Sequence, residues 1–274
     1  MMEIGIFAKT FSRNNVMDVI QAIQDYDIHT VQFNMACANL PTLPAKMERA
    51  TIRKLQNVFS TSNVHVAALS GTFNMIHPSI HERGKGLVGL ENLAYICECI
   101  GTNIITLCTG SRDANDMWKF HPENNSQKAW DDLLQTMEKA LKIAEKYDIV
   151  LGIEPELSNV INTASKARSM LDTFQSKHLK IIMDGANLIP IHRIHRMNPI
   201  LDEAFDLLGE DIILAHAKDL SIEQDDFVAA GQGNLDYRHY LSLLKSVGYE
   251  RPLIMHGLRE DQVSTSKSFL EKLS

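Results

Sequence analysis

The stretch IILAHAKDL, residues 212–220, combines a buried strand with a polar end. Its first four residues are apolar, and they are followed by His216, Lys218 and Asp219. Burying an unpaired imidazole, ammonium or carboxylate in a dry core costs free energy, so these groups are expected at the edge of the core. The stretch therefore predicts a buried strand whose carboxyl end faces a functional site.

Seven further runs share the Ile, Val and Leu content of a buried strand, at residues 3–8, 30–34, 64–69, 103–108, 149–154, 179–184 and 252–256. Between the runs, apolar residues recur at helical spacing, over residues 16–26, 126–147, 164–174, 198–208 and 237–248. Ser126 has the position of a helix N-cap, and Gly248 that of a C-terminal cap. Strands and helices that alternate eight times over ~250 residues are the pattern of a (β/α)8 barrel.

The competing architecture is an open, doubly wound α/β sheet. Such a sheet usually has a glycine-rich phosphate-binding turn after its first strand, but residues 4–15, IGIFAKTFSRNN, contain no GxGxxG pattern. No linker, low-complexity segment or block of charge indicates a domain boundary. We therefore predict the α/β class, with a (β/α)8 TIM barrel as a single domain over residues 1–274.

Composition narrows the class of protein. The chain has 274 residues, of which 45% are hydrophobic and 22% charged, so it is long enough for one large folded core. A net charge of −7 disfavours binding to a phosphate backbone, and the strongest basic stretch, residues 190–199, is short. We expect no nucleic-acid partner. The chain shows neither a signal peptide nor an apolar run near the ~20 residues of a membrane span. We therefore expect no membrane association and a cytoplasmic protein.

In a barrel of this kind, chemistry collects at the carboxyl ends of the strands. Polar residues follow the apolar runs there, in GIEPE at 152–156, IMDGAN at 182–187 and IMHGL at 254–258, besides HAKD at 216–219. Side chains alternate between the two faces of a strand, so the even-numbered residues of each run share one face. If that face points into the barrel, four side chains meet at its mouth: Glu154, Asp184, His216 and His256.

Two carboxylates and two imidazoles at one place have the composition of a metal site. A single carboxylate after a strand is more often a helix cap or half of an ion pair, and a single histidine near a core is more often structural. Four such residues on four consecutive strands indicate a site. Oxygen and nitrogen donors without a thiolate suit Mn²⁺, Co²⁺, Zn²⁺, Fe²⁺ or Mg²⁺. We therefore predict one divalent metal ion, with the ligands Glu154, Asp184, His216 and His256.

These motifs, together with GQGNLDY at 231–237, resemble the xylose isomerase-like barrel superfamily over essentially the whole chain. Its members include sugar and sugar-phosphate isomerases and epimerases, dehydratases and apurinic-site endonucleases. The metal ligands of the family are usually a glutamate after strand five, an aspartate after strand six, the histidine of an HxKD motif and a glutamate after strand eight. The resemblance implies Glu154, Asp184 and His216 as ligands, with His256 in the place of the second glutamate.

Two departures from the family bear on function. In its epimerases, the two glutamates also form the acid/base pair, so His256 leaves that pair incomplete. An imidazole titrates near neutral pH and can still bind metal or move a proton. The endonuclease branch has zinc-binding histidines on strands three and four, near the positions of Ser70 and Cys108 in this chain. Those missing histidines and the acidic net charge argue against DNA repair.

The implied chemistry is proton removal from a carbon next to a carbonyl. A divalent metal stabilises the resulting enediolate, and a carboxylate takes the proton. We predict Glu154 and His256 as catalytic residues, with Glu154 as the base. Lys218 is expected to bind a substrate oxygen or phosphate, the alternatives being a surface lysine or an ion pair with Asp219. Further substrate contacts are expected from Glu156, Asn187, Asn74 and Arg259.

The predicted function is a divalent-metal-dependent isomerase or epimerase that acts on a small sugar, sugar phosphate or polyol ketone. A lyase that dehydrates a related polyol is the nearest alternative, because it starts with the same proton removal. A carbohydrate-binding barrel without catalysis is a further alternative, prompted by His256, and an apurinic-site endonuclease is the least favoured. The expected partner is a small-molecule carbohydrate, and homo-oligomers are common among sugar isomerases of this type.

Overall fold

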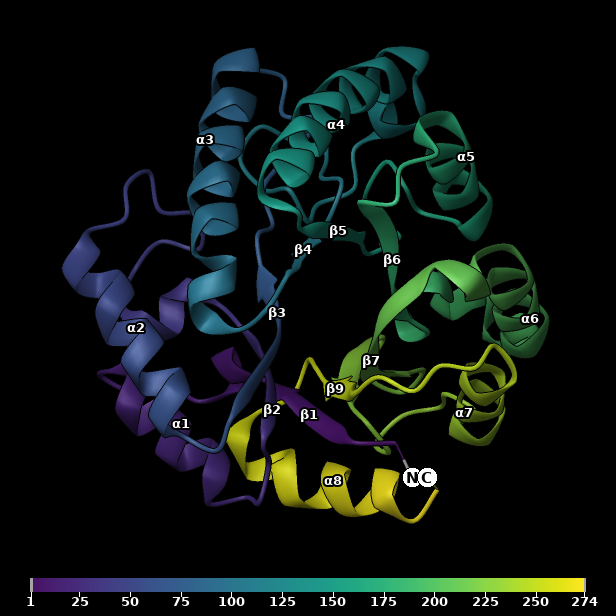
Figure 1. Cartoon of the computed structure of the whole chain (residues 1–274). Helices are drawn as coiled ribbons and strands as arrows, with labels where there is room; N and C mark the ends of the chain where they lie inside the picture. The colour runs from purple at the N-terminus through teal and green to yellow at the C-terminus, as the bar shows by residue number, and fades with distance from the viewer. Residues whose placement is uncertain (1, 274) are drawn as a thin grey trace.

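The computed structural model describes residues 2–273, which form a closed parallel barrel and confirm the predicted (β/α)8 class (Figure 1). Eight strands of this region pair in the order β1-β2-β3-β4-β5-β6-β7-β9, and β9 pairs with β1 to close the ring. Each predicted run overlaps one of them. Their bounds are Ile4–Phe7 (β1), Thr30–Phe33 (β2), His65–Ser70 (β3), Ile104–Leu107 (β4), Val150–Ile153 (β5), Leu179–Asp184 (β6), Ile212–Ser221 (β7) and Leu253–Met255 (β9).

Helices cover the outside of the barrel (Figure 1). The predicted helices α1, α4, α5, α6 and α7 begin within one residue of the expected position. The sequence pattern did not reveal the other three in the described part of the chain, α2, α3 and α8. The bounds are Val16–Gln24 (α1), Arg49–Thr61 (α2), Ile80–Cys97 (α3), Gln127–Tyr147 (α4), Ala164–Phe174 (α5), Met197–Leu208 (α6), Tyr237–Ser246 (α7) and Val263–Glu271 (α8).

Helix α3 escaped prediction because packing, rather than local preference, determines it. It contains three glycines, which have a low helix propensity. A Cβ on Gly86 would lie 2.0 Å from the Phe73 ring, and a Cβ on Gly89 would lie 2.6 Å from Leu43 Cβ. Two of the three glycines, Gly86 and Gly89, are therefore required by close contact with neighbouring segments, and that requirement has no periodic signature in the sequence.

The two predicted helix caps are confirmed. At the start of α4, Ser126 Oγ accepts a hydrogen bond from the Ala129 N–H at 3.2 Å. Helix α7 ends at Ser246, and Gly248 follows with a φ of +71°, a left-handed conformation that glycine adopts without strain. Local sequence therefore sets these two helix ends.

Aliphatic side chains fill the barrel interior. One buried cluster comprises Ala68, Ile104, Ile182, Leu214 and Ile254, from five different strands. Its members on β6, β7 and β9 have the even numbers that strand parity predicted for the inward face. The next even-numbered residues along these three strands are those predicted for the site, so they emerge where the packed interior ends.

The apolar run predicted as strand seven covers residues 212–217. Strand β7 continues four residues further, to Ser221, and forms an antiparallel hairpin with β8 (Asp226–Ala229). Asp219 holds this hairpin and the loop after it. Its carboxylate accepts hydrogen bonds of 2.8–3.1 Å from the backbone N–H groups of Leu220, Gly231, Gly233 and Leu235. A predicted alternative, an ion pair between Lys218 and Asp219, is wrong because successive residues of a strand point to opposite faces.

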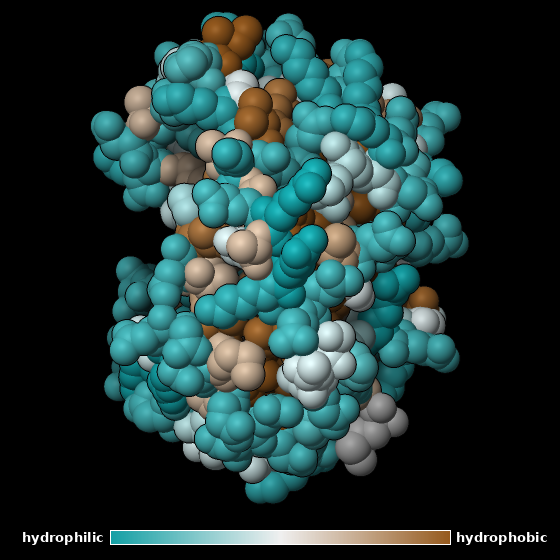
Figure 2. Space-filling view, turned by 60° about the vertical axis from the view of Figure 1, so that its left-hand side comes forward, coloured by the Kyte–Doolittle hydropathy of each residue, from teal (hydrophilic) through white to brown (hydrophobic). Residues whose placement is uncertain are grey.

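Figure 2 shows one side of the molecule, and the surface there is mostly hydrophilic. On the side that Figure 2 shows, hydrophobic residues appear in small groups between hydrophilic ones. Among residues 2–273, no helix has the length and apolar content that crossing a membrane requires.

A buried ion triad holds the loop between β4 and α4 against the neighbouring helices. Arg112 lies in this loop, Asp132 in α4 and Arg83 in α3, and each residue is at most 7% exposed. The Asp132 carboxylate is 2.5 Å from Arg112 Nη2 and 3.0 Å from Arg83 Nη1. Burial opposes ionisation of Asp132, but the two guanidinium groups outweigh it and lower its pKa to about 2.

We expect Asp132→Asn to lower the free energy of unfolding at neutral pH by about 3 kcal/mol, because two guanidinium groups lose their buried counter-charge. The pKa of Asp132 is lower in the folded chain (about 2) than in an unfolded chain (about 3.9). The native protein therefore keeps this contribution above about pH 4 and loses it as the pH falls towards 2, a dependence that the variant lacks. Chemical denaturation at a series of pH values measures both effects.

Lys128→Ala is the matched control. Lys128 Nζ also pairs with Asp132, at 3.3 Å, but its side chain is 80% exposed. Its removal should change the free energy of unfolding by no more than about 0.5 kcal/mol. Equal losses in the two variants would contradict a buried triad.

Candidate active site

The four residues predicted to converge lie together at the carboxyl end of the barrel. Glu154 follows β5, Asp184 ends β6, His216 lies within β7 and His256 follows β9. His216 Nδ1 is 3.3 Å from Glu154 Oε1 and 3.6 Å from Asp184 Oδ2. The rings of His216 and His256 are stacked, with centroids 4.8 Å apart. Strand parity therefore predicted correctly which side chains meet.

His216 is oriented from both sides of its ring. Its Nε2 is 2.8 Å from the side-chain oxygen of Gln32 on β2. Gln32 in turn donates from Nε2 to Ser70 Oγ at 3.2 Å. An amide oxygen accepts only, so the proton lies on His216 Nε2, which donates to Gln32. Gln32 thereby leaves Nδ1 as the nitrogen that faces the two carboxylates.

His256 is held between two rings. It stacks on Phe7 with centroids 4.8 Å apart and an interplanar angle of 20°, and on His216 at an angle of 7°. Its Nδ1 is buried and has no hydrogen-bond partner among residues 2–273. Burial, followed by the positive charge of His216, lowers the pKa of His256 to about 3. The side chain is therefore a neutral imidazole with one unsatisfied nitrogen.

The carboxylates of the cluster are ionised although they are buried. Glu154 is 7% exposed and Asp184 1%. Burial alone would raise both pKa values, but His216 holds the pKa of Glu154 below its ordinary value. Lys218 and His216 together do the same, more strongly, for the pKa of Asp184. The two carboxylates in turn raise the pKa of His216 to about 9 against the effect of its burial. The ion pairs with His216 and Lys218 therefore balance the two carboxylates, and a metal ion that binds His216 Nδ1 would replace the proton on that nitrogen.

The arrangement of donor atoms also fits a metal ion. Asp184, His216 and His256 each offer one ligand atom, and these atoms lie within 4.8 Å of one another. In the described part of the chain, Asp184 Oδ2 and His256 Nδ1 are buried without a hydrogen-bond partner. Buried polar atoms normally have a partner, so His256 Nδ1 points to a missing one. Asp184 Oδ2, by contrast, has ion-pair contacts of 3.5 and 3.6 Å with Lys218 and His216 but no hydrogen bond among residues 2–273. Glu154 lies beside this group of three, where its Oε1 accepts a hydrogen bond from Asn187 Nδ2 at 2.6 Å.

A cavity of 580 Å³ opens over the cluster. It is lined by Glu154 and His256, and also by three predicted substrate contacts, Lys218, Glu156 and Asn187. Lys218 Nζ donates a hydrogen bond to Asn187 Oδ1. Glu156 Oε2 is buried without a partner among residues 2–273, and burial raises the pKa of this carboxyl group. The volume falls within the range of about 300–1000 Å³ that suits small-molecule ligands.

Two other predicted substrate contacts lie outside this cavity. Asn74 is not among its lining residues, and its Nδ2 donates to the Ser111 carbonyl at 2.7 Å. Asn74 therefore joins the loops that follow β3 and β4. Arg259 follows β9 but is exposed, and it pairs with Asp261 at 2.9 Å. It lines a neighbouring cavity instead.

Sequence reasoning missed the aromatic residues of the cavity, Phe7, Trp118 and Phe227. Phe7 ends β1, so strand parity was available as a signal for it. Trp118 lies in the β4–α4 loop and Phe227 in the unpredicted strand β8, where no periodicity indicates a site. The Phe227 ring centroid is 3.9 Å from Lys218 Nζ, a favourable cation–π contact.

A family model described as xylose isomerase-like TIM barrel matches residues 18–273 of the chain. A curated relative, an uncharacterized protein of Methanocaldococcus jannaschii, is 27% identical over 146 residues. The match covers 52% of this chain and 48% of the relative, so the chain spans about half the length of the curated relative it matches.

Several solved structures share the fold at low sequence identity. The 3-keto-D-glucoside 4-epimerase from E. coli has a TM-score of 0.76 and 17% identity, over 99% of this chain and 100% of that chain. A D-tagatose 3-epimerase-like protein has a TM-score of 0.76 and 15% identity, over 99% and 97% of the two chains. The IOLI protein, solved with a zinc atom, has a TM-score of 0.74 and 17% identity, over 100% and 98%. At these identities, the likeness establishes the fold alone.

We expect the purified protein to hold about one equivalent of divalent metal, because buried carboxylates and imidazoles converge on one place. Asp184→Ala and His256→Ala should each weaken metal binding by at least about tenfold, since each removes a candidate ligand. Mass spectrometric metal analysis after dialysis against Mn²⁺ and Zn²⁺ measures this.

Asp202→Ala and His239→Ala provide matched controls, because these two residues form an ion pair of 2.7 Å at the surface. Both controls should keep the metal. Metal that depends on Asp184 and survives His256→Ala would remove His256 from the ligand set. A parent protein that takes up no metal would contradict the site altogether.

Proposed function

The chain belongs to the xylose isomerase-like TIM barrel family, and on this premise we propose that it is a divalent-metal-dependent isomerase or epimerase of a small sugar or sugar derivative. One observation carries the proposal. The group formed by Asp184, His216 and His256 lies beside the Glu154 carboxylate, and two of these four residues, Glu154 and His256, line a ligand-sized cavity. A base beside a cation site suits proton removal next to a carbonyl.

We assign Asp184, His216 and His256 to the metal, with Glu154 completing the set. A bound divalent ion would polarise the substrate carbonyl and stabilise the negative charge that develops on its oxygen. The zinc atom in the IOLI structure supports a metal ion in a protein of this fold. The donor atoms suit Mn²⁺, Co²⁺, Fe²⁺, Zn²⁺ or Mg²⁺.

Glu154 is the group that we propose to take the proton. Asn187 Nδ2 donates to its Oε1 at 2.6 Å and orients it. Among the described residues, Oε2 receives only a long contact of 3.9 Å from Cys108 Sγ. Glu154 therefore has one oxygen fixed in place and one free to accept a proton from a substrate carbon. Its lowered pKa keeps it in the ionised form that this step needs.

The replacement of the second glutamate by His256 affects which reaction is open to the chain. An aldose–ketose isomerisation moves one proton between adjacent carbons, so the single base Glu154 is sufficient. Epimerisation needs a proton returned from the opposite face of the substrate. His256 could return one only as an imidazolium that does not bind the metal, a form that its pKa of about 3 disfavours at neutral pH. We propose Lys218 Nζ as the donor to a substrate oxygen, and Asn187 and Glu156 as hydroxyl contacts.

A screen of ketoses, aldoses and their epimers with added Mn²⁺ or Co²⁺ in D₂O tests the proposal. We expect turnover with incorporation of solvent deuterium next to the carbonyl, because the abstracted proton exchanges with water. Glu154→Gln keeps the size of the side chain but cannot accept a proton, so kcat should fall by at least about 100-fold. Proton NMR follows both product and deuterium.

Glu156→Gln is the matched control, since Glu156 lines the same cavity but has its carboxyl pKa raised by burial. We expect its effect to fall mainly on KM. Deuterium incorporation that survives Glu154→Gln would contradict the assigned base. Loss of water from the substrate would identify a dehydratase, and saturable sugar binding without turnover would leave a binding protein.

A further inference from the structure

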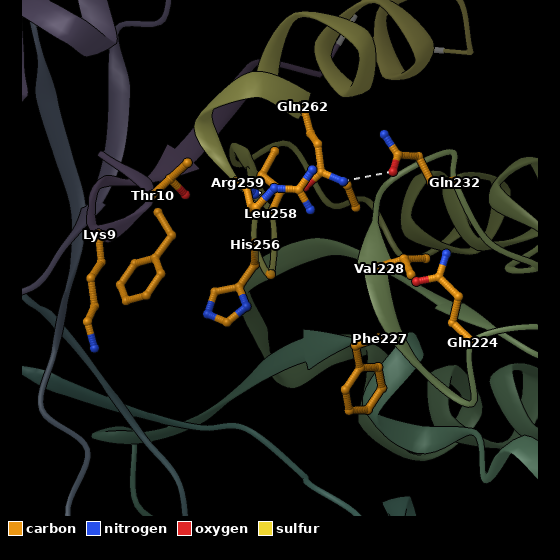
Figure 3. A pocket seen from close by; sticks show the side chains of 13 residues that line it. Lys9, Thr10, Gln224, Phe227, Val228, Gln232, His256, Leu258, Arg259 and Gln262 are labelled. Carbon is orange, nitrogen blue, oxygen red and sulfur yellow. Dashed lines mark hydrogen bonds between the residues drawn. The ribbon is translucent and has the colours of Figure 1, made fainter. Parts of the chain in front are cut away.

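A second cavity, of 650 Å³, lies beside the first between the loop after β1, the β7–β8 hairpin and the loop after β9 (Figure 3). Four residues line both cavities: Phe7, Lys9, Phe227 and His256. In Figure 3, Lys9 and Phe227 flank the His256 ring from opposite sides. The two cavities are therefore compartments of one cleft that meet at His256.

The lining of the second compartment differs in chemistry from that of the first. Glu154 and Glu156 line the first, whereas no carboxylate among residues 2–273 lines the second. Three amides and a hydroxyl line it instead: Gln224, Gln232, Gln262 and Thr10. Amides and hydroxyls both donate and accept hydrogen bonds, which matches the hydroxyls of a sugar ring. The two phenylalanine rings at the boundary offer apolar faces for its C–H groups.

The walls of the second compartment are held in place before any ligand binds. Gln262 Nε2 donates to Gln232 Oε1 at 2.9 Å, a bond that joins the loop after β9 to the loop after the hairpin (Figure 3). Gln262 Oε1 also accepts from the Arg259 N–H at 2.8 Å. The Asp219 carboxylate binds the backbone on both sides of Gln232. Polar groups that are already ordered lose less entropy when they bind a ligand.

We propose that the second compartment binds a second sugar ring, so that the substrate is a glycoside, such as a disaccharide with a ketose end. This inference rests on the proposed function, which places the reacting sugar in the first compartment. Cavities of about 300–1000 Å³ hold small-molecule ligands. The compartment of 580 Å³ over the metal cluster therefore has room for a monosaccharide, and the 650 Å³ beside it remains for a further ring.

A phosphate group is the competing occupant, because two cations line the second compartment. Arg259, however, is already paired with Asp261 through hydrogen bonds of 3.1 and 2.9 Å. Lys9 is exposed and has no ion pair within residues 2–273, so it is the one free cation in this lining. Phosphate sites usually combine several cations or backbone N–H groups. One ammonium, three amides and a large volume favour an uncharged ring.

The test is a titration calorimetry series with the full-length protein and added Mn²⁺. The ligands are fructose, fructose 6-phosphate and four glucosyl-fructoses (trehalulose, turanose, maltulose and isomaltulose), which differ only in the hydroxyl that carries glucose. We expect at least one disaccharide to bind about tenfold more tightly than fructose, since the second ring adds one or two net hydrogen bonds. Gln224→Trp, which fills part of the second compartment, should reduce this preference by about tenfold.

Glu223→Trp is the matched control, because Glu223 adjoins Gln224 in the same exposed turn but lines neither compartment. It should keep the preference for the disaccharide. The inference is overturned if no disaccharide binds more tightly than fructose, or if both tryptophan variants lose the preference equally. Tightest binding of fructose 6-phosphate that is lost in Lys9→Met would also overturn it, in favour of a phosphate site.

Calorimetry on these ligands, together with a turnover assay on the same ligands, separates this inference from the proposed function. Turnover of fructose without any preference for a disaccharide would overturn the second compartment alone. A preference for a disaccharide that no metal converts into turnover would support the compartment and contradict the proposed reaction.

Discussion

Two carboxylates that are more than nine-tenths buried must be balanced by nearby positive charge, and this requirement organises the mouth of the barrel. Glu154 and Asp184 are nearly dry, and an uncompensated buried charge is strongly destabilising. Strand β7 supplies the balance through His216 and Lys218, two residues apart on one face. Gln32, from the opposite side, fixes the orientation of the imidazole. A divalent cation would extend the same balance, and the unsatisfied atoms of the cluster mark the place for it.

Much of this arrangement could be predicted from the sequence, because in a barrel the position of a residue along its strand determines whether its side chain points inward. Alternating apolar runs and helical periods are sufficient for the fold class, and parity along each strand selects the inward side chains. Glu154, Asp184, His216 and His256 therefore meet as expected. The roles assigned to them stay predictions until metal content and turnover are measured.

What the sequence could not provide depends on loops and on packing between distant segments. Asn74 and Arg259 both follow strands, but their side chains turn to other partners than the cavity. No local pattern encodes these directions. Trp118 and Phe227 enter the cavity from a loop and from a hairpin that only the folded chain reveals. Helix α3 depends on glycines whose neighbours are remote in sequence.

His256 stands at the position where the resemblance to the family implies a glutamate. A carboxylate at this position would add a third negative charge to a buried cluster that already holds two. The imidazole instead offers a flat, neutral surface that stacks between Phe7 and His216. Its ring also forms part of the wall between the two cavities. An imidazole in place of a carboxylate at position 256 therefore changes both the charge of the cluster and the shape of the cleft.

Neighbouring residues of strand β7 point to opposite faces and make different contacts. Lys218 faces the buried charge cluster, while Asp219 faces outward and holds the loop after the hairpin. Phe227 of the hairpin contacts Lys218 Nζ, but the loop after the hairpin is held by Asp219, so this loop can vary without disturbing the charge cluster. Insertions or exchanges there can alter the outer wall of the cleft while the charge balance inside stays intact. Variation in this loop can therefore change which molecules the cleft accepts without changing the charged groups of the site.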